Sequence, residues 1–231
     1  MRVYGHRGAA GHRPENTLAS VRHALALGAD GVEIDVCLLD DALIVLHDDT
    51  LDRTTNGQGP YKSWDLTALR ALDAGDGERI PLLEEVIALA IDRAELNIEV
   101  KEAGIAELVI ARTLAATAAS PAWRSRILLS SFDAPTSAVL ARLRGAMRFG
   151  LLYEEPFEAA LQRALTLKAQ SLHMSLEHLD AAHVARAHAE GLAVYVYTVN
   201  DPAAIARCQA AAVDAVFSDY PDRVLAARQH G

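Results

Sequence analysis

The chain has 231 residues, of which 51% are hydrophobic, and it carries a formal net charge of -9 at pH 7. This acidic balance argues against a surface that binds nucleic acid or anionic membranes, because such a surface needs a basic patch. The sequence contains no run of about 18 apolar residues, so it predicts no membrane-spanning helix.

The beginning of the chain and its cysteines lead to two further expectations. A strand-like pattern, "RVYG", starts directly after Met1 without a signal or transit segment, so we expect a cytoplasmic location. Cys37 and Cys208 form no redox or metal-binding motif, and we interpret both as small core residues.

Strand-like and helix-like segments alternate along almost the whole chain. The expected strands end near Gly5, Val36, Val100, Ser130, Leu152, Met174, Thr198 and Ser218. Helical patterns between them include residues 18–25, 82–91, 105–118 and 202–212. Their boundaries carry the usual signals, since Gly28 lies where the first helix should end and Asp201-Pro202 resembles a helix start.

Eight strands that are each followed by a helix predict an α/β fold, the (β/α)8 TIM barrel. The structural alternative is a doubly wound open sheet. No GxGxxG fingerprint follows any expected strand, which makes this alternative weaker. We therefore expect residues 1–231 to form a single barrel domain.

One segment interrupts the alternation between the second strand and its helix. It begins with an extra strand ending at His47 and continues with polar, glycine-rich residues 48–81. Loops of this length in a compact domain usually have a function or a structure of their own. Because a loop that follows a barrel strand lies at the C-terminal face, we expect residues 48–81 to form an insertion at the mouth of the barrel.

Acidic residues alternate with apolar residues in two of the expected strands. In "GVEIDVCLL", residues 31–39, Glu33 and Asp35 share one face while the apolar residues share the other. The later strand "LNIEVK" repeats this arrangement, with Asn97, Glu99 and Lys101 on one face. Since the apolar faces suit the helix layer, these acidic side chains should point into the barrel near its mouth.

Carboxylates gathered away from water either become neutral or bind a cation. Residues two apart on a strand are separated by roughly 6–7 Å, so their carboxylates can lean toward one ion. Oxygen donors alone favour Mg²⁺ or Ca²⁺ over zinc. The alternative is a network of salt bridges that joins the acids to Lys101 and nearby arginines.

Two histidines occur where barrel enzymes place catalytic residues. His6 follows the first strand in "YGHRG", and His47 ends the extra strand in "VLHDD". Beside an acidic metal site, this pair favours general acid–base chemistry. Arg7 and Lys101 add positive charge at the same mouth, which suits a phosphate group. His173 follows the sixth strand without this context. It could line the mouth, but we assign it no role.

These motifs together resemble the glycerophosphodiester phosphodiesterase family, and the resemblance runs nearly from end to end. The matching segments, in order, are "HRG", "PENT", "EID", "LHDDTLDRTTNGQG", "LDAG", "RIPLLEEV", "IEVK", "YTVN" and "SDYPD". The resemblance implies a TIM barrel that uses a divalent cation to hydrolyse glycerophosphodiesters to sn-glycerol 3-phosphate and an alcohol. Its substrate is then a small molecule, with no nucleic acid and no stable membrane association.

The resemblance also implies roles for individual residues. The implied set is Glu33, Asp35 and Glu99 as metal ligands, His6 and His47 as general acid and base, and Arg7 and Lys101 as phosphate-binding residues. Tyr197 stands where the family commonly has Trp, and its ring can pack on the glycerol carbons with a smaller face. Residues 48–81 resemble the family's insertion but are short between "LDAG" and "RIP".

Other functions are compatible with parts of this pattern. A phospholipase-type lyase on the same scaffold would release a cyclic phosphate or act on lysophospholipids. Lys101 could form a Schiff base, as in an aldolase, and a barrel without activity could bind glycerophosphodiesters. The run Arg53–Gly57 either forms a polar turn that begins the insertion or supports His47 and Asp48.

Overall fold

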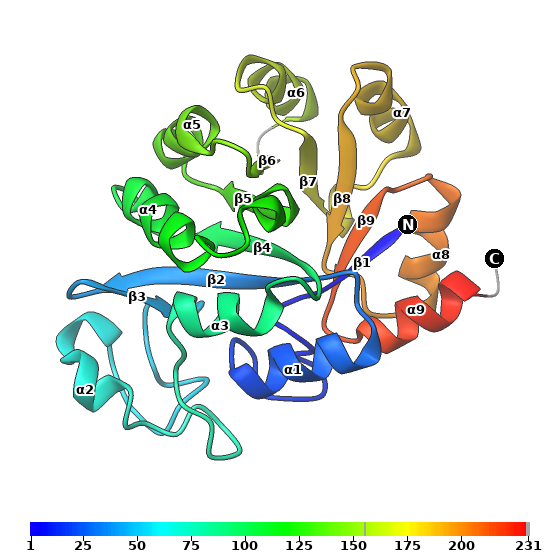
Figure 1. Cartoon of the computed structure of the whole chain (residues 1–231). Helices are drawn as coiled ribbons and strands as arrows, with labels where there is room; N and C mark the ends of the chain where they lie inside the picture. Colours follow the sequence, from blue (N-terminus) through cyan, green and yellow to red (C-terminus); the bar gives the residue numbers. More distant parts are fainter. Residues whose placement is uncertain (155, 230–231) are drawn as a thin grey trace.

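The computed structural model describes residues 1–154 and 156–229. Within these residues eight parallel strands form a closed barrel with helices around it (Figure 1). The barrel strands are β1 (Arg2–Gly5), β2 (Gly31–Leu39), β4 (Glu95–Val100), β5 (Ile127–Ser131), β6 (Arg148–Leu152), β7 (Ser171–Ser175), β8 (Ala193–Tyr197) and β9 (Ala215–Ser218). Because β1 pairs with both β9 and β2, the sheet closes, and the predicted (β/α)8 TIM barrel is confirmed.

Helices cover the outside of the ring. The longer ones are α1 (Leu18–Leu27), α3 (Leu83–Ala90), α4 (Ala106–Ala116), α5 (Ala134–Leu143), α6 (Phe157–Thr166), α7 (Ala181–Ala189), α8 (Pro202–Ala210) and α9 (Pro221–Gln229). Shorter 3₁₀ turns are η2 (Pro121–Arg126) and η3 (Leu176–His178). No helix in residues 1–154 and 156–229 is both long and apolar enough to cross a membrane.

The helix boundaries follow from capping residues. Thr17 accepts a hydrogen bond from the Ser20 amide at the start of α1, and Gly28 ends this helix in the left-handed conformation with φ 86°. Asp201 caps α8 in the same way, with Pro202 in its first turn. Both predicted boundaries are confirmed, because these signals depend on neighbouring residues alone.

The second strand differs from its expected length. It continues three residues past Val36, where it pairs antiparallel with β3 (Ala42–Val45). The extra strand was expected to reach His47, but it ends at Val45, and His47 lies two residues further along. The chain thus turns at residues 40–41, and β3 runs back toward the barrel and brings His47 to its mouth.

The polar segment 48–81 has a small apolar core of its own. It contains η1 (Tyr61–Ser63) and α2 (Leu66–Leu69), and in Figure 1 α2 and β3 lie at one edge of the molecule, outside the ring of parallel strands. Its buried residues pack on one face of the β2–β3 hairpin, in a cluster of Cys37, Leu39, Ile44, Leu46, Leu51, Tyr61, Leu69, Ala74 and Ile80. This packing explains how a long glycine-rich segment stays ordered.

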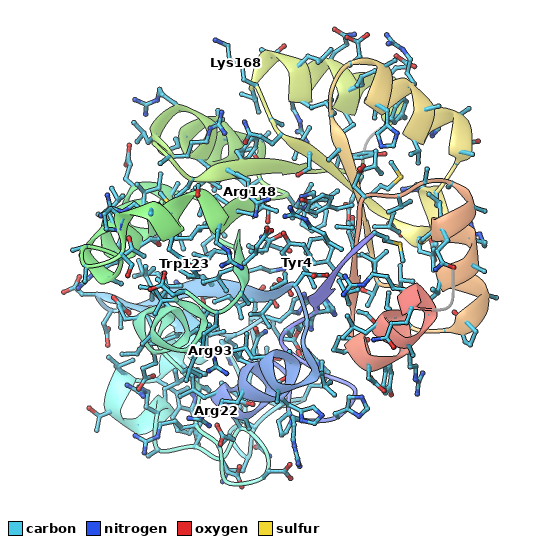
Figure 2. The ribbon with its side chains drawn as sticks, turned by 45° about the vertical axis from the view of Figure 1, so that its right-hand side comes forward. Tyr4, Arg22, Arg93, Trp123, Arg148 and Lys168 are labelled. Carbon is cyan, nitrogen blue, oxygen red and sulfur yellow. The ribbon has the colours of Figure 1, made fainter. Side chains whose placement is uncertain are left out.

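The N-terminal end of the barrel is closed by a charged cluster. Figure 2 shows Tyr4 and Arg148 near the centre of the molecule, and both contact the carboxylate of Glu95, which also pairs with Arg2. Above this cluster the interior is filled by Tyr4, Leu128, Tyr195 and Phe217. The open space of the barrel therefore lies on the side where the strands end.

Candidate active site

A cavity of about 150 Å³ opens at the C-terminal ends of the strands. All eight predicted site residues line it, namely His6, Arg7, Glu33, Asp35, His47, Glu99, Lys101 and Tyr197. They lie on, or within two residues of the end of, five strands, namely β1, β2, β3, β4 and β8. Parallel strands bring these positions to one end of the barrel, as the sequence pattern predicted.

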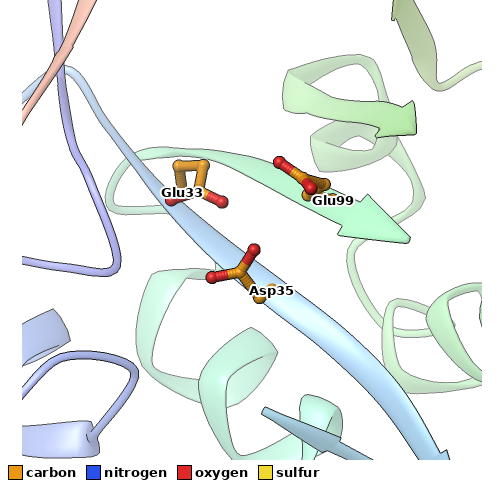
Figure 3. A group of neighbouring side chains, drawn as sticks. All are labelled: Glu33, Asp35 and Glu99. Atoms are coloured by element: carbon orange, nitrogen blue, oxygen red, sulfur yellow. The ribbon is translucent and has the colours of Figure 1, made fainter. Parts of the chain in front are cut away.

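Three carboxylates converge at this cavity. Glu33 and Asp35 alternate along β2, and Asp35 lies beside Glu99 of β4 in the parallel register. One oxygen from each carboxylate lies within 4.8 Å of the others (Figure 3). The side chains are withdrawn from water, since Glu33 is 5% exposed and Asp35 is 2% exposed.

The pKa values of this triad indicate that the negative charge of its carboxylates is not fully compensated by neighbouring residues. Burial and the neighbouring charge of Asp35 raise the pKa of Glu33 to about 8, and the same causes raise the pKa of Glu99. A divalent cation would compensate this charge, and three oxygen donors fit a hard cation such as Mg²⁺ or Ca²⁺.

The salt bridges predicted as an alternative are also present. Lys101 Nζ lies 2.8 Å from Glu99 Oε1 and 3.5 Å from Asp35 Oδ1. Arg7 Nε lies 3.3 Å from Asp35 Oδ2. Two cationic groups thus flank three acids, yet the pKa of Glu33 is still raised in their presence. Because the two ion pairs leave negative charge uncompensated, they are compatible with a cation site in the same cavity.

The charge state of Lys101 bears on the Schiff-base alternative. Burial lowers the pKa of Lys101, but the carboxylates of Glu99 and Asp35 raise it well above its ordinary value. A lysine that attacks a carbonyl group must be neutral, so its pKa has to be lowered. Lys101 is instead suited to hold an anion.

The "PENT" motif supports the triad from the loop before α1. Asn16 Nδ2 donates a hydrogen bond of 2.9 Å to Asp35 Oδ2, and its Oδ1 accepts from the Asp35 amide at 3.3 Å. Glu15 Oε1 accepts from Arg7 Nη1 at 2.6 Å. The motif therefore orients one acid and one cationic side chain, while Thr17 caps the helix.

His6 is oriented by a chain of polar groups that the sequence did not reveal. Its Nδ1 donates to Asp219 Oδ1 at 2.7 Å, and Asp219 Oδ2 accepts from Asn200 Nδ2 at 2.6 Å. Burial favours the neutral ring, but the hydrogen bond to Asp219 and the charge of Glu33 raise the pKa of His6 above its ordinary value. Nε2 is the ring nitrogen left for a substrate.

His47 is oriented in a similar way by Asp48. Its Nδ1 donates to Asp48 Oδ1 at 2.6 Å, and Arg53 Nε donates to Asp48 Oδ2 at 2.7 Å. The hydrogen bonds from Arg53 lower the pKa of Asp48 well below its usual range. Arg53 also pairs with Glu15, so it links segment 48–81 to the "PENT" loop.

The run Arg53–Gly57 thus combines both of its predicted interpretations. Arg53 supports Asp48 and, through it, His47. Asn56 belongs to the turn, because its Oδ1 accepts a hydrogen bond from the amide of Asp73 within the segment. The two roles fall on different residues of the run.

The sequence assigned no role to several residues of the site. Asp219 and Asn200 lie inside the motifs "SDYPD" and "YTVN". Asp219 directly follows β9 and Asn200 lies three residues after β8, and these positions were the available signal. Besides the eight predicted residues, the cavity is lined by Asn97, Ser130, Phe132, Leu152, His173, Thr198 and Phe217. An apolar wall is formed in part by Tyr197 and Phe132, whose rings meet edge to face at 6.0 Å.

Comparisons with known proteins place these features in context. A comparison with models of protein families matches residues 6–223 to the glycerophosphoryl diester phosphodiesterase family. A glycerophosphodiester phosphodiesterase of Caldanaerobacter subterraneus subsp. tengcongensis is 34% identical over 232 aligned positions, which cover 96% of each chain.

Solved structures of phosphodiesterases are similar to this chain over almost its whole length. A phosphodiesterase of Oleispira antarctica, in complex with the product sn-glycerol-3-phosphate, has a TM-score of 0.90 and 33% identity and covers 99% of this chain and 97% of its own. A glycerophosphodiester phosphodiesterase of Thermotoga maritima has a TM-score of 0.83 and 27% identity, with coverages of 98% and 97%.

Proposed function

This chain belongs to the glycerophosphoryl diester phosphodiesterase family, and we propose that it hydrolyses glycerophosphodiesters with the help of a divalent cation and two histidines. The observation that carries the proposal is the convergence of three acids, two cationic side chains and two aspartate-bound histidines in one cavity. The expected products are sn-glycerol 3-phosphate and an alcohol. The product in the Oleispira antarctica complex supports this expectation.

Glu33, Asp35 and Glu99 would hold the cation, Mg²⁺ or Ca²⁺, because their oxygens converge and their charge is not fully compensated. When bound, the cation supplies positive charge that stabilises negative charge developing on the phosphate. Arg7 and Lys101 stabilise the same charge from the rim of the cavity, since both remain protonated and carry several N–H donors.

The histidines would transfer protons through Nε2, because each Nδ1 is bound to an aspartate. In the first step the glycerol 2-hydroxyl attacks phosphorus and its proton passes to one histidine. The bond from phosphorus to the alcohol breaks, and the other histidine protonates the leaving oxygen. The attack is intramolecular and closes a five-membered ring, which avoids the entropy cost of positioning a separate nucleophile.

In the second step water attacks the cyclic phosphate while the histidines exchange roles. The bond between phosphorus and the 2-oxygen breaks, and the 2-oxygen takes a proton to give sn-glycerol 3-phosphate. The apolar wall that includes Tyr197 would pack on the glycerol carbons. Residues 1–231 would act as one catalytic domain, with segment 48–81 bordering the mouth through Arg53.

Glycerophosphocholine hydrolysis tests the proposal. EDTA should abolish turnover, and Mg²⁺ or Ca²⁺ should restore it, with far-UV circular dichroism confirming that the chelated protein stays folded. Full turnover after chelation would contradict the role of the cation. Phosphorus NMR should show sn-glycerol 3-phosphate as the final product, whereas a persistent cyclic phosphate would identify a lyase. A substrate without the 2-hydroxyl should resist cleavage, and normal cleavage would indicate direct attack by water.

A further inference from the structure

The cavity has a polar floor formed by Asn97 and His173, which neither the motifs nor the proposed proton transfer explain. Asn97 lies beside Glu33 in the register of β2 and β4, and His173 lies on β7. Asn97 is 1% exposed and His173 is 0% exposed, yet both line the cavity. Each presents a buried polar atom, Asn97 Oδ1 or His173 Nδ1, that has no hydrogen-bond partner among residues 1–154 and 156–229.

The orientation of the Asn97 amide follows from its neighbours. Nδ2 lies 2.8 Å from Ser130 Oγ and 3.4 Å from the carbonyl oxygen of Leu128. Because a carbonyl oxygen only accepts hydrogen bonds, the NH₂ group must face it, and Oδ1 is the free atom. Leaving such an acceptor buried and unpaired is unfavourable, which indicates that a donor completes the site.

His173 is held rigidly with its second nitrogen free. Its ring stacks on Tyr195 at 5.0 Å between centroids, and Nε2 lies 2.9 Å from Ser171 Oγ. Space for the ring exists because residue 150 is glycine, where an added Cβ would lie 2.2 Å from Nε2. Burial and the charge of Arg148 lower the pKa of His173 to about 3, so the ring is neutral.

These two atoms select a chemical class of ligand. Asn97 Oδ1 needs a hydrogen donor, while neutral His173 presents a donor or an acceptor at Nδ1 according to its tautomer. A hydroxyl group satisfies both, because it donates one hydrogen and accepts others. A phosphate group suits the rim better, where Arg7 and Lys101 are located.

We propose that the polar floor, Asn97 and His173, binds the terminal hydroxyl of the glycerol unit in the substrate. This inference rests on the proposed function and names the part of the substrate that enters first. The floor is backed by a packed cluster that includes Tyr195 and Phe217, whose rings both contact the ring of His173. The glycerol unit is common to all glycerophosphodiesters and therefore fits the closed end, and the variable alcohol remains at the open mouth.

The test compares glycerophosphocholine with 2-hydroxypropyl phosphocholine of the same configuration, in which hydrogen replaces the terminal hydroxyl and the 2-hydroxyl is kept. The wild type should prefer glycerophosphocholine by about 10- to 100-fold in kcat/KM, because the analogue leaves buried polar atoms unpaired. Asn97→Leu and His173→Phe should each reduce this preference. Ser171→Ala is the matched control, since it removes the bond at Nε2 but keeps Nδ1, and it should retain the preference.

A binding measurement provides a readout that does not need turnover. By calorimetry with Mg²⁺ present, sn-glycerol 3-phosphate should bind the wild type about 10-fold or more tightly than 2-hydroxypropyl phosphate, and the two floor variants should lose this difference. The inference would be overturned if the two phosphodiesters had equal kcat/KM values and the two phosphate monoesters bound with equal affinity. Water would then be the group that pairs with Asn97 and His173. Failure to cleave either phosphodiester would instead refute the proposed function, and the calorimetry would still test the floor. Having two variants covers the case in which one does not fold.

Discussion

Substituting Asp219 by Asn should disable His6 without removing it. Asp219 accepts hydrogen bonds from two donors, His6 Nδ1 at 2.7 Å and Asn200 Nδ2 at 2.6 Å. Asn200 cannot reverse its amide, because its Oδ1 accepts from the Asp219 amide at 2.9 Å and from Ser218 Oγ at 3.2 Å. The one oxygen of the new Asn side chain must therefore face Asn200, and its NH₂ group must face His6.

This geometry forces His6 into the wrong tautomer. Nδ1 would have to accept a hydrogen bond, so the proton would move to Nε2 and leave no base facing the substrate. General acid–base catalysis by one group contributes about 10²–10⁴-fold in rate, and we expect a loss of kcat in this range. KM for glycerophosphocholine should change little, because the phosphate-binding residues Arg7 and Lys101 are unaffected.

The assay is steady-state hydrolysis of glycerophosphocholine across pH. Asp219 contributes to the raised pKa of His6. The apparent pKa that the pH–rate profile gives for this histidine should therefore be lower in the variant than in the wild type. Asp222→Asn is a matched control, since Asp222 forms a similar 2.7 Å contact with His12 away from the cavity, and it should retain activity. A value of kcat for Asp219→Asn close to that of the wild type would refute this reasoning.

Three further predictions concern the cavity. Replacing His6 or His47 by Ala should each reduce turnover of glycerophosphocholine by about 10² or more, and near-normal rates in either variant would exclude that histidine from proton transfer. Gly150→Ala should destabilise the fold by about 1–3 kcal/mol in urea unfolding, because the new Cβ would lie 2.2 Å from His173 Nε2, and unchanged stability would mean that the ring moves freely. The pKa of His173 is about 3 in the folded chain, against 6.5 for an unperturbed histidine, so below pH 6.5 the unfolded chain takes up a proton that the folded chain does not. Stability should accordingly fall with decreasing pH, by about 2 kcal/mol between pH 7 and 5 from this residue, and His173→Phe should lack that part of the loss when urea unfolding is compared at the two pH values. An identical loss in both proteins would contradict the neutral, buried state of the ring.

Much of the barrel could be predicted because its signals are local. Glu33 and Asp35 share a strand face for purely geometric reasons, since successive side chains alternate. Gly28 ends α1 because only its own backbone has to adopt the left-handed conformation. The end of β2 was misjudged because pairing with β3, and not local preference, extends the strand past Val36.

The sequence by itself determined the alternation of strands and helices, the caps, and the order of the acidic, basic and histidine residues at strand ends. Only the tertiary structure decided which further residues meet them. His6 and Asp219 are 213 residues apart in the chain, and Asn97 and His173 line the same cavity from different strands. Contacts between neighbours in the chain depend on fixed backbone geometry, whereas contacts across the barrel depend on how the ring of strands closes, and no local pattern names the individual residues that this closure pairs.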